Sequence, residues 1–346
     1  MKSISTRLHA LSFTIIITLL TACGGGGDNE GKTPSSNNDG SSSGLNGLLV
    51  VDAWDFNGYG GIPQGIFAFE LSAGKLTMHK RLTSGDQGVK PYIHNRNVIT
   101  YSEPCNGQSL FHRTKTIDLD GLSSDIIVPC SNTLSPYFIF AKYNTSKISP
   151  NKKYIAIEIA THDIEDPSLE KFIVKVFNME TKEELSSYEN YGSPEWHPNG
   201  QLLISAGKLN NKKGIYITDK NFTQLTRIDK VTVNQNANFL RISPVDNKLI
   251  FTMSGNIWMA EINNKLELDN LQKIVDDGYI AETPTWSPNG KYIAYLSFTD
   301  QNASRKITFL HIASKKLTVL ATEHIFPPDS YGIDSMRPGS SLSWVK

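Results

Sequence analysis

Cysteine is scarce in this sequence, with three residues in 346. They lack the C-x-x-C spacing and the neighbouring histidine cluster of a zinc or redox site, so we predict no metal and no cofactor. Lysine plus arginine and aspartate plus glutamate number 34 each and form no basic stripe, which argues against nucleic acid as a partner. The apolar run from Leu11 to Leu20 is too short for a transmembrane helix.

The first residues instead predict an export signal. Lys2 and Arg7 precede the apolar run, and the sequence Leu20-Thr21-Ala22-Cys23 follows it. This tetrapeptide resembles the lipobox of bacterial lipoproteins, and the resemblance implies a signal peptide over residues 1–22 and acylation of Cys23. Gly24 rather than aspartate follows the cysteine, which in that family implies sorting to the outer membrane. We therefore expect a lipid-anchored protein of the cell envelope, facing the periplasm or the cell surface.

Residues 23–47 are rich in glycine, serine and asparagine and contain almost no apolar side chain. Such a segment cannot bury enough surface to offset its chain entropy. We interpret it as a flexible tether with a root-mean-square span of roughly 25 Å. The folded part is then residues 48–346, long enough for a sizeable hydrophobic core.

The two remaining cysteines, Cys105 and Cys130, would lie in an oxidising compartment, where a disulfide is the natural interpretation. The alternative is a pair of free thiols in a redox or metal site.

Four related decapeptides reveal an internal repeat: WSPNGKYIAY from Trp286, WHPNGQLLIS from Trp196, ISPVDNKLIF from Ile242 and ISPNKKYIAI from Ile148. A weaker copy, IHNRNVITY, starts at Ile93. Successive copies start 55, 48, 46 and 44 residues apart. Periods of this length indicate propeller blades. Each unit continues with alternating segments rich in Ile, Val, Tyr and Phe, which predicts four antiparallel strands per unit. The Ser or His before each repeated proline is interpreted as a turn cap.

The ends of the chain complete the count. The segment after Leu48 supplies three strands without the repeated decapeptide, while the C-terminal SLSWVK supplies one strand, in which Trp344 matches Trp286. We predict an all-β, six-bladed β-propeller whose ring is closed by the C-terminal strand in blade 1. The predicted blades are 48–83 plus 341–346, 90–130, 145–188, 193–229, 238–276 and 283–323.

The repeat resembles that of TolB-like propellers, W-S-P-D-G-K-x-I-A-[FY] followed by I-Y-x-x-D and L-T. Residues 286–295 are the best copy, with Asn289 where aspartate is usual, and the resemblance covers residues 48–346. It implies the propeller strongly and the function weakly. The α/β domain that precedes the propeller in TolB itself is replaced here by the tether, and no G-x-S-x-G motif of a prolyl-oligopeptidase-type enzyme follows the last blade.

Long connections on one face of the propeller carry the candidate binding residues. These connections are residues 54–64, 131–147, 161–171, 298–305 and 324–340, and they are rich in aromatic side chains, which favour interface cores. The candidates are Trp54, Asp55, Tyr59, Tyr137, His162, Asp163 and Tyr331. The alternative is that such rings merely pack the loops onto the blades.

Three functions remain open. The first is a non-enzymatic module, a monomeric propeller that binds an envelope protein or a ligand. The second is a lactonase-like or lyase-like enzyme with a metal or carboxylate site at the channel mouth. The third is a structural subunit of an envelope assembly. Since propellers host unrelated functions, the choice depends on the site rather than on the fold.

Overall fold

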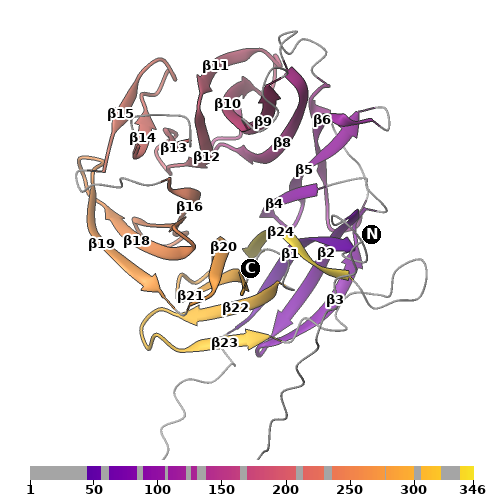
Figure 1. Cartoon of the computed structure of the whole chain (residues 1–346), viewed down its shortest axis with the longest axis vertical. Coiled ribbons are helices and arrows are strands. Elements are labelled where there is room, and N and C mark those ends of the chain that lie inside the picture. Colours follow the sequence, from indigo (N-terminus) through magenta and orange to yellow (C-terminus); the bar gives the residue numbers. More distant parts are fainter. Residues whose placement is uncertain are drawn as a thin grey trace, which may run out of the picture. The chain divides into compact units, whose positions relative to one another are not determined.

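The computed structural model describes residues 45–55, 62–83, 89–105, 108–121, 126–130, 138–163, 170–207, 213–229, 236–276, 278–299, 305–320 and 336–346. These residues form strands that group into six four-stranded antiparallel blades (Figure 1). No helix in the described part of the chain is long and apolar enough to cross a membrane.

Each blade runs from an inner strand to an outer strand. Blade 1 contains β24 (Met336–Val345), β1 (Gly47–Asp55), β2 (Ile62–Ser72) and β3 (Lys75–Arg81); blade 2 contains β4 (Val89–Asn95), β5 (Val98–Cys105), β6 (Gln108–Ile117) and β7 (Ile126–Val128); blade 3 contains β8 (Phe138–Ile148), β9 (Tyr154–Asp163), β10 (Glu170–Asn178) and β11 (Glu184–Glu189). Blade 4 contains β12 (Tyr191–Trp196), β13 (Leu202–Ala206), β14 (Ile215–Thr218) and β15 (Leu225–Arg227); blade 5 contains β16 (Asn238–Ile242), β17 (Lys248–Met253), β18 (Asn256–Ile262) and β19 (Leu268–Val275); blade 6 contains β20 (Ile280–Trp286), β21 (Tyr292–Phe298), β22 (Lys306–His311) and β23 (Leu317–Leu320).

The C-terminal strand closes the ring, as the sequence predicted. β24 pairs with β1 in antiparallel register, with Leu49 opposite Trp344 and Val50 opposite Ser343. The inner strands contact one another in a closed cycle, in the order β24, β4, β8, β12, β16, β20 and back to β24. In addition, a single parallel bridge between Phe111 and Ala141 joins blades 2 and 3 into one sheet.

Six hydrophobic clusters fill the six interfaces between neighbouring blades. β2 shows how one strand serves two of them: Phe67 and Phe69 pack toward blade 6, whereas Ile66 and Ala68 pack toward blade 2. Successive side chains of a strand point to opposite faces of the sheet. The central strands are therefore apolar on both faces, and burial of these faces stabilises the ring by roughly 25 cal/mol per Å² of apolar surface.

The short turns between first and second strands are capped as the sequence indicated. The Ser287 hydroxyl donates to Asn289 Oδ1 at 2.7 Å and accepts the Tyr292 N–H at 2.9 Å, and Ser149 bonds Asn151 and Tyr154 in the same way. These residues thus hold hairpins, and we call the face that carries the turns the short-turn face. The opposite face, where second-to-third-strand loops and blade connections lie, is the long-loop face.

The long connections are shorter than predicted, because paired strands extend into them. The described parts of β1, β2, β8, β9, β10 and β24 take up portions of the segments 54–64, 131–147, 161–171 and 324–340. The predicted start of the closing strand at Ser341 is likewise corrected to Met336. Asp55 pairs with both Ile62 and Met336, so the backbone hydrogen bonds continue past the predicted boundaries. Pro338 is accommodated because β24 is an edge strand of its sheet.

Candidate functional site

The inner strands place one residue of each blade at a repeated position beside the propeller axis. The first residue of each repeated decapeptide packs into a blade interface, as Trp196, Trp286 and Trp344 do. The axial residue is the one directly before it. Because side chains alternate along a strand, the preceding residue faces the axis. The six positions are Tyr92, Lys147, Glu195, Arg241, Thr285 and Ser343.

A β-bulge interrupts every inner strand shortly before this position. The register shifts between Val89 and Tyr92 in β4, and an equivalent shift occurs in the other five inner strands. Four residues at the bulges have a positive φ, namely Lys90, Ser193, Phe239 and Thr283, with values between 47° and 56°. A bulge adds one residue and redirects the strand. It thereby bends each inner strand near its start.

Four of the six axial residues form a buried ionic group, which we call the axial cluster: Tyr92, Lys147, Glu195 and Arg241. The Lys147 ammonium forms a salt bridge with Glu195 and donates to the Leu240 carbonyl at 3.2 Å. Arg241 Nη1 lies 3.8 Å from Glu195 Oε2. Both cations lie 5.1 Å from the centre of the Tyr92 ring. Two cations therefore share one carboxylate and one aromatic face at the axis.

Burial dominates the electrostatics of this cluster. Lys147 is 1% exposed, and desolvation, followed by repulsion from Arg241, lowers its pKa to about 7 although Glu195 opposes the shift. Desolvation and the charge of Lys147 likewise lower the pKa of the adjacent His94 to about 3. Burial raises the pKa of Tyr92, so this phenol stays protonated. Each shift disfavours a charged form, because burial removes the side chain from bulk solvent.

A cavity of about 390 Å³ lies above the axial cluster, at the bulged starts of the inner strands. We call it the axial cavity. It opens toward the long-loop face, where the inner strands begin. All six inner strands contribute lining residues: Lys90, Thr145, Ser193, Arg241, Thr283 and Ser341 are one from each blade.

Several residues of this lining carry buried polar atoms that have no hydrogen-bond partner in the part of the chain that the structure describes. Arg241 Nε, Thr283 Oγ1 and Asn236 Oδ1 are buried without a hydrogen bond among the described residues. Arg241 is 7% exposed and Thr283 is 2% exposed. Leaving such a group unsatisfied costs about 1–3 kcal/mol. Buried polar groups are otherwise almost always bonded, so their concentration among the residues of one cavity makes this cavity the candidate site.

The carboxylates that line the axial cavity are already engaged. Glu158 accepts the Ser193 N–H, and Glu282 lies 3.6 Å from Arg305. Among the described residues, no group of three or more His, Cys, Asp or Glu side chains is arranged to hold a metal ion.

The predicted binding residues lie elsewhere or outside the described part of the chain. Trp54 and Asp55 end β1, and His162 and Asp163 end β9, both at the long-loop face. The structure therefore places these four at strand ends rather than in free loops. Tyr59, Tyr137, Tyr331 and the lipidation residue Cys23 lie outside the described residues.

Cys105 and Cys130 form a disulfide with a Cα–Cα distance of 6.0 Å. Cys105 ends β5 and Cys130 follows β7, so the bond ties the second strand of blade 2 to the end of its fourth strand. It lies on the long-loop face, and it confirms the disulfide that the sequence predicted.

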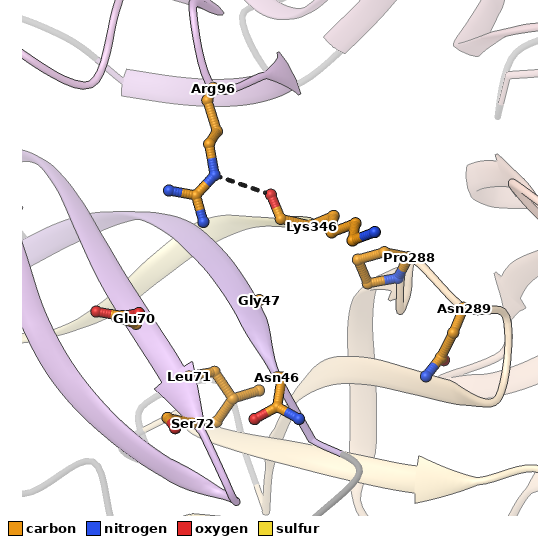
Figure 2. Close-up of a pocket in the computed structure, with 9 residues that line it drawn as sticks. All are labelled: Asn46, Gly47, Glu70, Leu71, Ser72, Arg96, Pro288, Asn289 and Lys346. Atoms are coloured by element: carbon orange, nitrogen blue, oxygen red, sulfur yellow. Dashed lines mark hydrogen bonds between the residues drawn. The ribbon is translucent and has the colours of Figure 1, made fainter.

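A second cavity, of about 450 Å³, lies on the short-turn face near the start of β1. Figure 2 shows its side chains, with Arg96 reaching across from blade 2 to the C-terminal residue. Arg96 Nε donates to the Lys346 carbonyl at 3.1 Å. Most of the polar residues here are exposed, and they include Asn46, Glu70 and Asn289. This cavity surrounds the ring closure and lacks the buried, unpartnered groups of the axial cavity.

Comparison with known proteins supports the fold. Neither a protein-family model nor a curated protein sequence matches this chain. The chain is a six-bladed β-propeller. Its fold is similar to that of TolB from Acinetobacter baumannii, with a TM-score of 0.58 and 12% identity over 87% of this chain and 67% of that one.

Two further solved structures are similar at lower coverage or lower score. Kuenenia stuttgartiensis hydrazine synthase matches with a TM-score of 0.57 and 10% identity over 86% of this chain, which spans about half of that chain, 47%. Oligogalacturonate lyase from Vibrio parahaemolyticus matches with a TM-score of 0.48 and 11% identity, over 75% of this chain and 72% of that one. At such identities the likeness concerns the fold alone.

Proposed function

We propose that this chain is a binding module of the cell envelope that holds a ligand in its axial cavity. One observation carries the proposal: among the described residues, buried polar atoms of Arg241, Thr283 and Asn236 lack hydrogen-bond partners, and all three residues line a single cavity to which all six blades contribute. The cavity lies within the range of about 300–1,000 Å³ that is typical of small-molecule sites. The ring of blades would hold the backbone of these residues in place, so that only side chains adjust to a ligand.

Binding fits the axial residues better than catalysis does. The Lys147 ammonium contacts Glu195 and the Leu240 carbonyl, so it is engaged within the protein and is not available as a free catalytic group. One observation favours an enzyme, namely that the pKa of Lys147 is near 7, as a general base requires. A lactonase-like or lyase-like reaction with Lys147 as base is therefore the second candidate function.

Anchoring through Cys23 is the other part of the proposal, supported by the lipobox-like sequence. Two or three acyl chains would hold the protein stably at a bilayer. In a bacterial host, Cys23→Ser should move the protein from the membrane fraction to the soluble fraction and abolish labelling by an alkyne-tagged palmitate. If Cys23→Ser stayed in the membrane fraction and the wild type took up no palmitate label, this part of the proposal would be wrong.

The axial cavity is tested by filling it. In Thr145→Trp an indole would occupy the cavity, because Thr145 lines it and is half-buried. Val319→Trp is the matched control, since Val319 is 55% exposed on β23, the outer strand of blade 6. The full-length protein is purified from membranes in mild detergent, and native mass spectrometry detects small molecules that remain bound.

We expect a bound species on the wild type and on Val319→Trp, and none on Thr145→Trp. Equal occupancy of all three proteins, or a wild type that carries nothing, would contradict the proposed site. The second candidate function is tested by turnover of a panel of lactones and uronides. Activity that is lost in Lys147→Met but kept in Thr145→Trp would favour an enzyme that acts outside the cavity.

A further inference from the structure

We propose that the ligand of the axial cavity is a small organic acid, bound through its carboxylate by the guanidinium of Arg241. This inference rests on the proposed function and names the chemistry of the same site. The argument starts from the hydrogen bonds that Arg241 makes and those that it does not make.

The hydrogen bonds that the Arg241 guanidinium makes to described residues all come from one nitrogen, Nη1. Nη1 donates to the Leu240 carbonyl at 2.9 Å and lies near Glu195, whereas Nε has no hydrogen-bond partner among the described residues. Nε and Nη2 together form the edge that binds the two oxygens of a carboxylate in parallel hydrogen bonds. Because Arg241 lines the cavity, a small rotation of its terminal torsions would present this edge to a ligand.

The charge of the site also favours an anion. Within the axial cluster, Lys147 and Arg241 share the single carboxylate of Glu195. Of the two other glutamates that line the cavity, Glu158 acts through its charge on Lys147, and Glu282 lies 3.6 Å from Arg305. Glu195 lies 3.8 Å from Arg241 and much closer to Lys147, so a ligand carboxylate would give this guanidinium a closer ionic partner.

Two further groups would position the rest of the ligand. Thr283 Oγ1 and Asn236 Oδ1 are buried at the same cavity without partners among the described residues. A hydroxyl both donates and accepts, and an amide oxygen accepts, so they suit a hydroxyl or amine on the ligand. The cavity volume of about 390 Å³ suits a small molecule rather than a folded partner.

The experiment compares acids with their neutral amides. Succinate, glutarate and phenylacetate are titrated into the detergent-solubilised full-length protein by calorimetry, each beside the corresponding amide, with inorganic phosphate as a second anion. We expect at least one acid to bind at least tenfold more tightly than its amide, because charged hydrogen bonds are lost in the amide. Phosphate binding as tight as that of the best acid would overturn the assignment to a carboxylate.

Three variants locate the contact. Arg241→Lys keeps the positive charge but cannot form the bidentate pair of hydrogen bonds, and it should weaken binding of the best acid at least tenfold. Thr283→Val removes only a hydroxyl and should weaken it two- to tenfold. Arg96→Lys, a matched change on the short-turn face, should leave binding unchanged. Thermal unfolding of each variant shows whether it is folded, and Thr283→Val keeps the test valid should Arg241→Lys not fold.

The outcomes separate this inference from the function on which it rests. If amides bind as tightly as acids and Thr145→Trp abolishes both, the cavity is a binding site but the carboxylate assignment is wrong. If no acid binds at millimolar concentration, the assignment is also wrong. If, in addition, nothing co-purifies with the wild type, the proposed function fails with it.

Discussion

Replacing Trp344 by alanine tests the closure of the ring. Trp344 is 5% exposed, packs edge-on against Phe309 at a ring-centre distance of 5.3 Å, and donates from Nε1 to the Asn46 carbonyl at 3.2 Å. Removal of a buried tryptophan costs about 3–5 kcal/mol. A domain has only about 5–15 kcal/mol of stability in total. Trp344→Ala should therefore remove a large fraction of it and lower the melting temperature by roughly 10 °C.

The assay must distinguish loss of closure from loss of any buried tryptophan. Trp286 is the matched control, because it occupies the equivalent position, is 4% exposed and donates to the Arg241 carbonyl at 3.0 Å. Both variants should lose similar free energy in urea titrations. Only Trp344→Ala, however, should speed amide hydrogen exchange in β1, since β24 is the strand that joins β1 to the C-terminus. Equal exchange of β1 in both variants, or a loss below about 1 kcal/mol for Trp344→Ala, would refute this account of closure.

Three further predictions concern buried charge and the disulfide. Glu195→Gln leaves the Lys147 ammonium without its carboxylate and should cost about 1–2 kcal/mol near pH 6 in urea titrations, because a lysine of pKa about 7 can instead lose its proton there for about 1.4 kcal/mol. The deficit should vanish as the pH rises above about 7, and a pH-independent deficit would contradict this prediction. The pKa of His94 is lowered to about 3, so unfolding takes up a proton below about pH 6.5. The melting temperature should therefore fall as the pH is lowered, and it should fall less steeply with pH in His94→Gln. Identical slopes of melting temperature against pH would refute the role of His94. The bond between Cys105 and Cys130 closes a separation of 25 residues; reduction should cost roughly 3–4 kcal/mol by the loop-entropy argument, and an unchanged melting temperature in dithiothreitol would contradict it.

The repeat was enough to predict the architecture. The positions of Ile93, Ile148, Trp196, Ile242 and Trp286 each fall in an inner strand, and Trp344 supplies the sixth. The reason is physical: each decapeptide combines a buried interface residue, a proline-containing turn and an alternating second strand, and these three features together fit only one place in a blade. The closing strand was predictable because blade 1 lacked its copy.

The axial cluster was visible in the sequence but was not recognised. Lys147, Glu195 and Arg241 are charged residues that each directly precede a repeated decapeptide, and alignment of the repeats would have placed them together. What the sequence does not reveal is the bulge in each inner strand. Bulges depend on pairing with the neighbouring strand, so they are set by the sheet rather than by local residues. Sequence reasoning favoured the long connections for the same reason, since it could not show that β1 and β9 extend into them.

The place of β1 within its blade has a mechanical consequence. The residues that precede Gly47 lead into a strand that is flanked on one side by β24 and on the other by β2. A pull on that segment would load two ladders of hydrogen bonds at once, in shear along the strand. A strand at a sheet edge would instead peel away one bond at a time. A propeller fastened through this strand is therefore suited to bear tension without opening its ring.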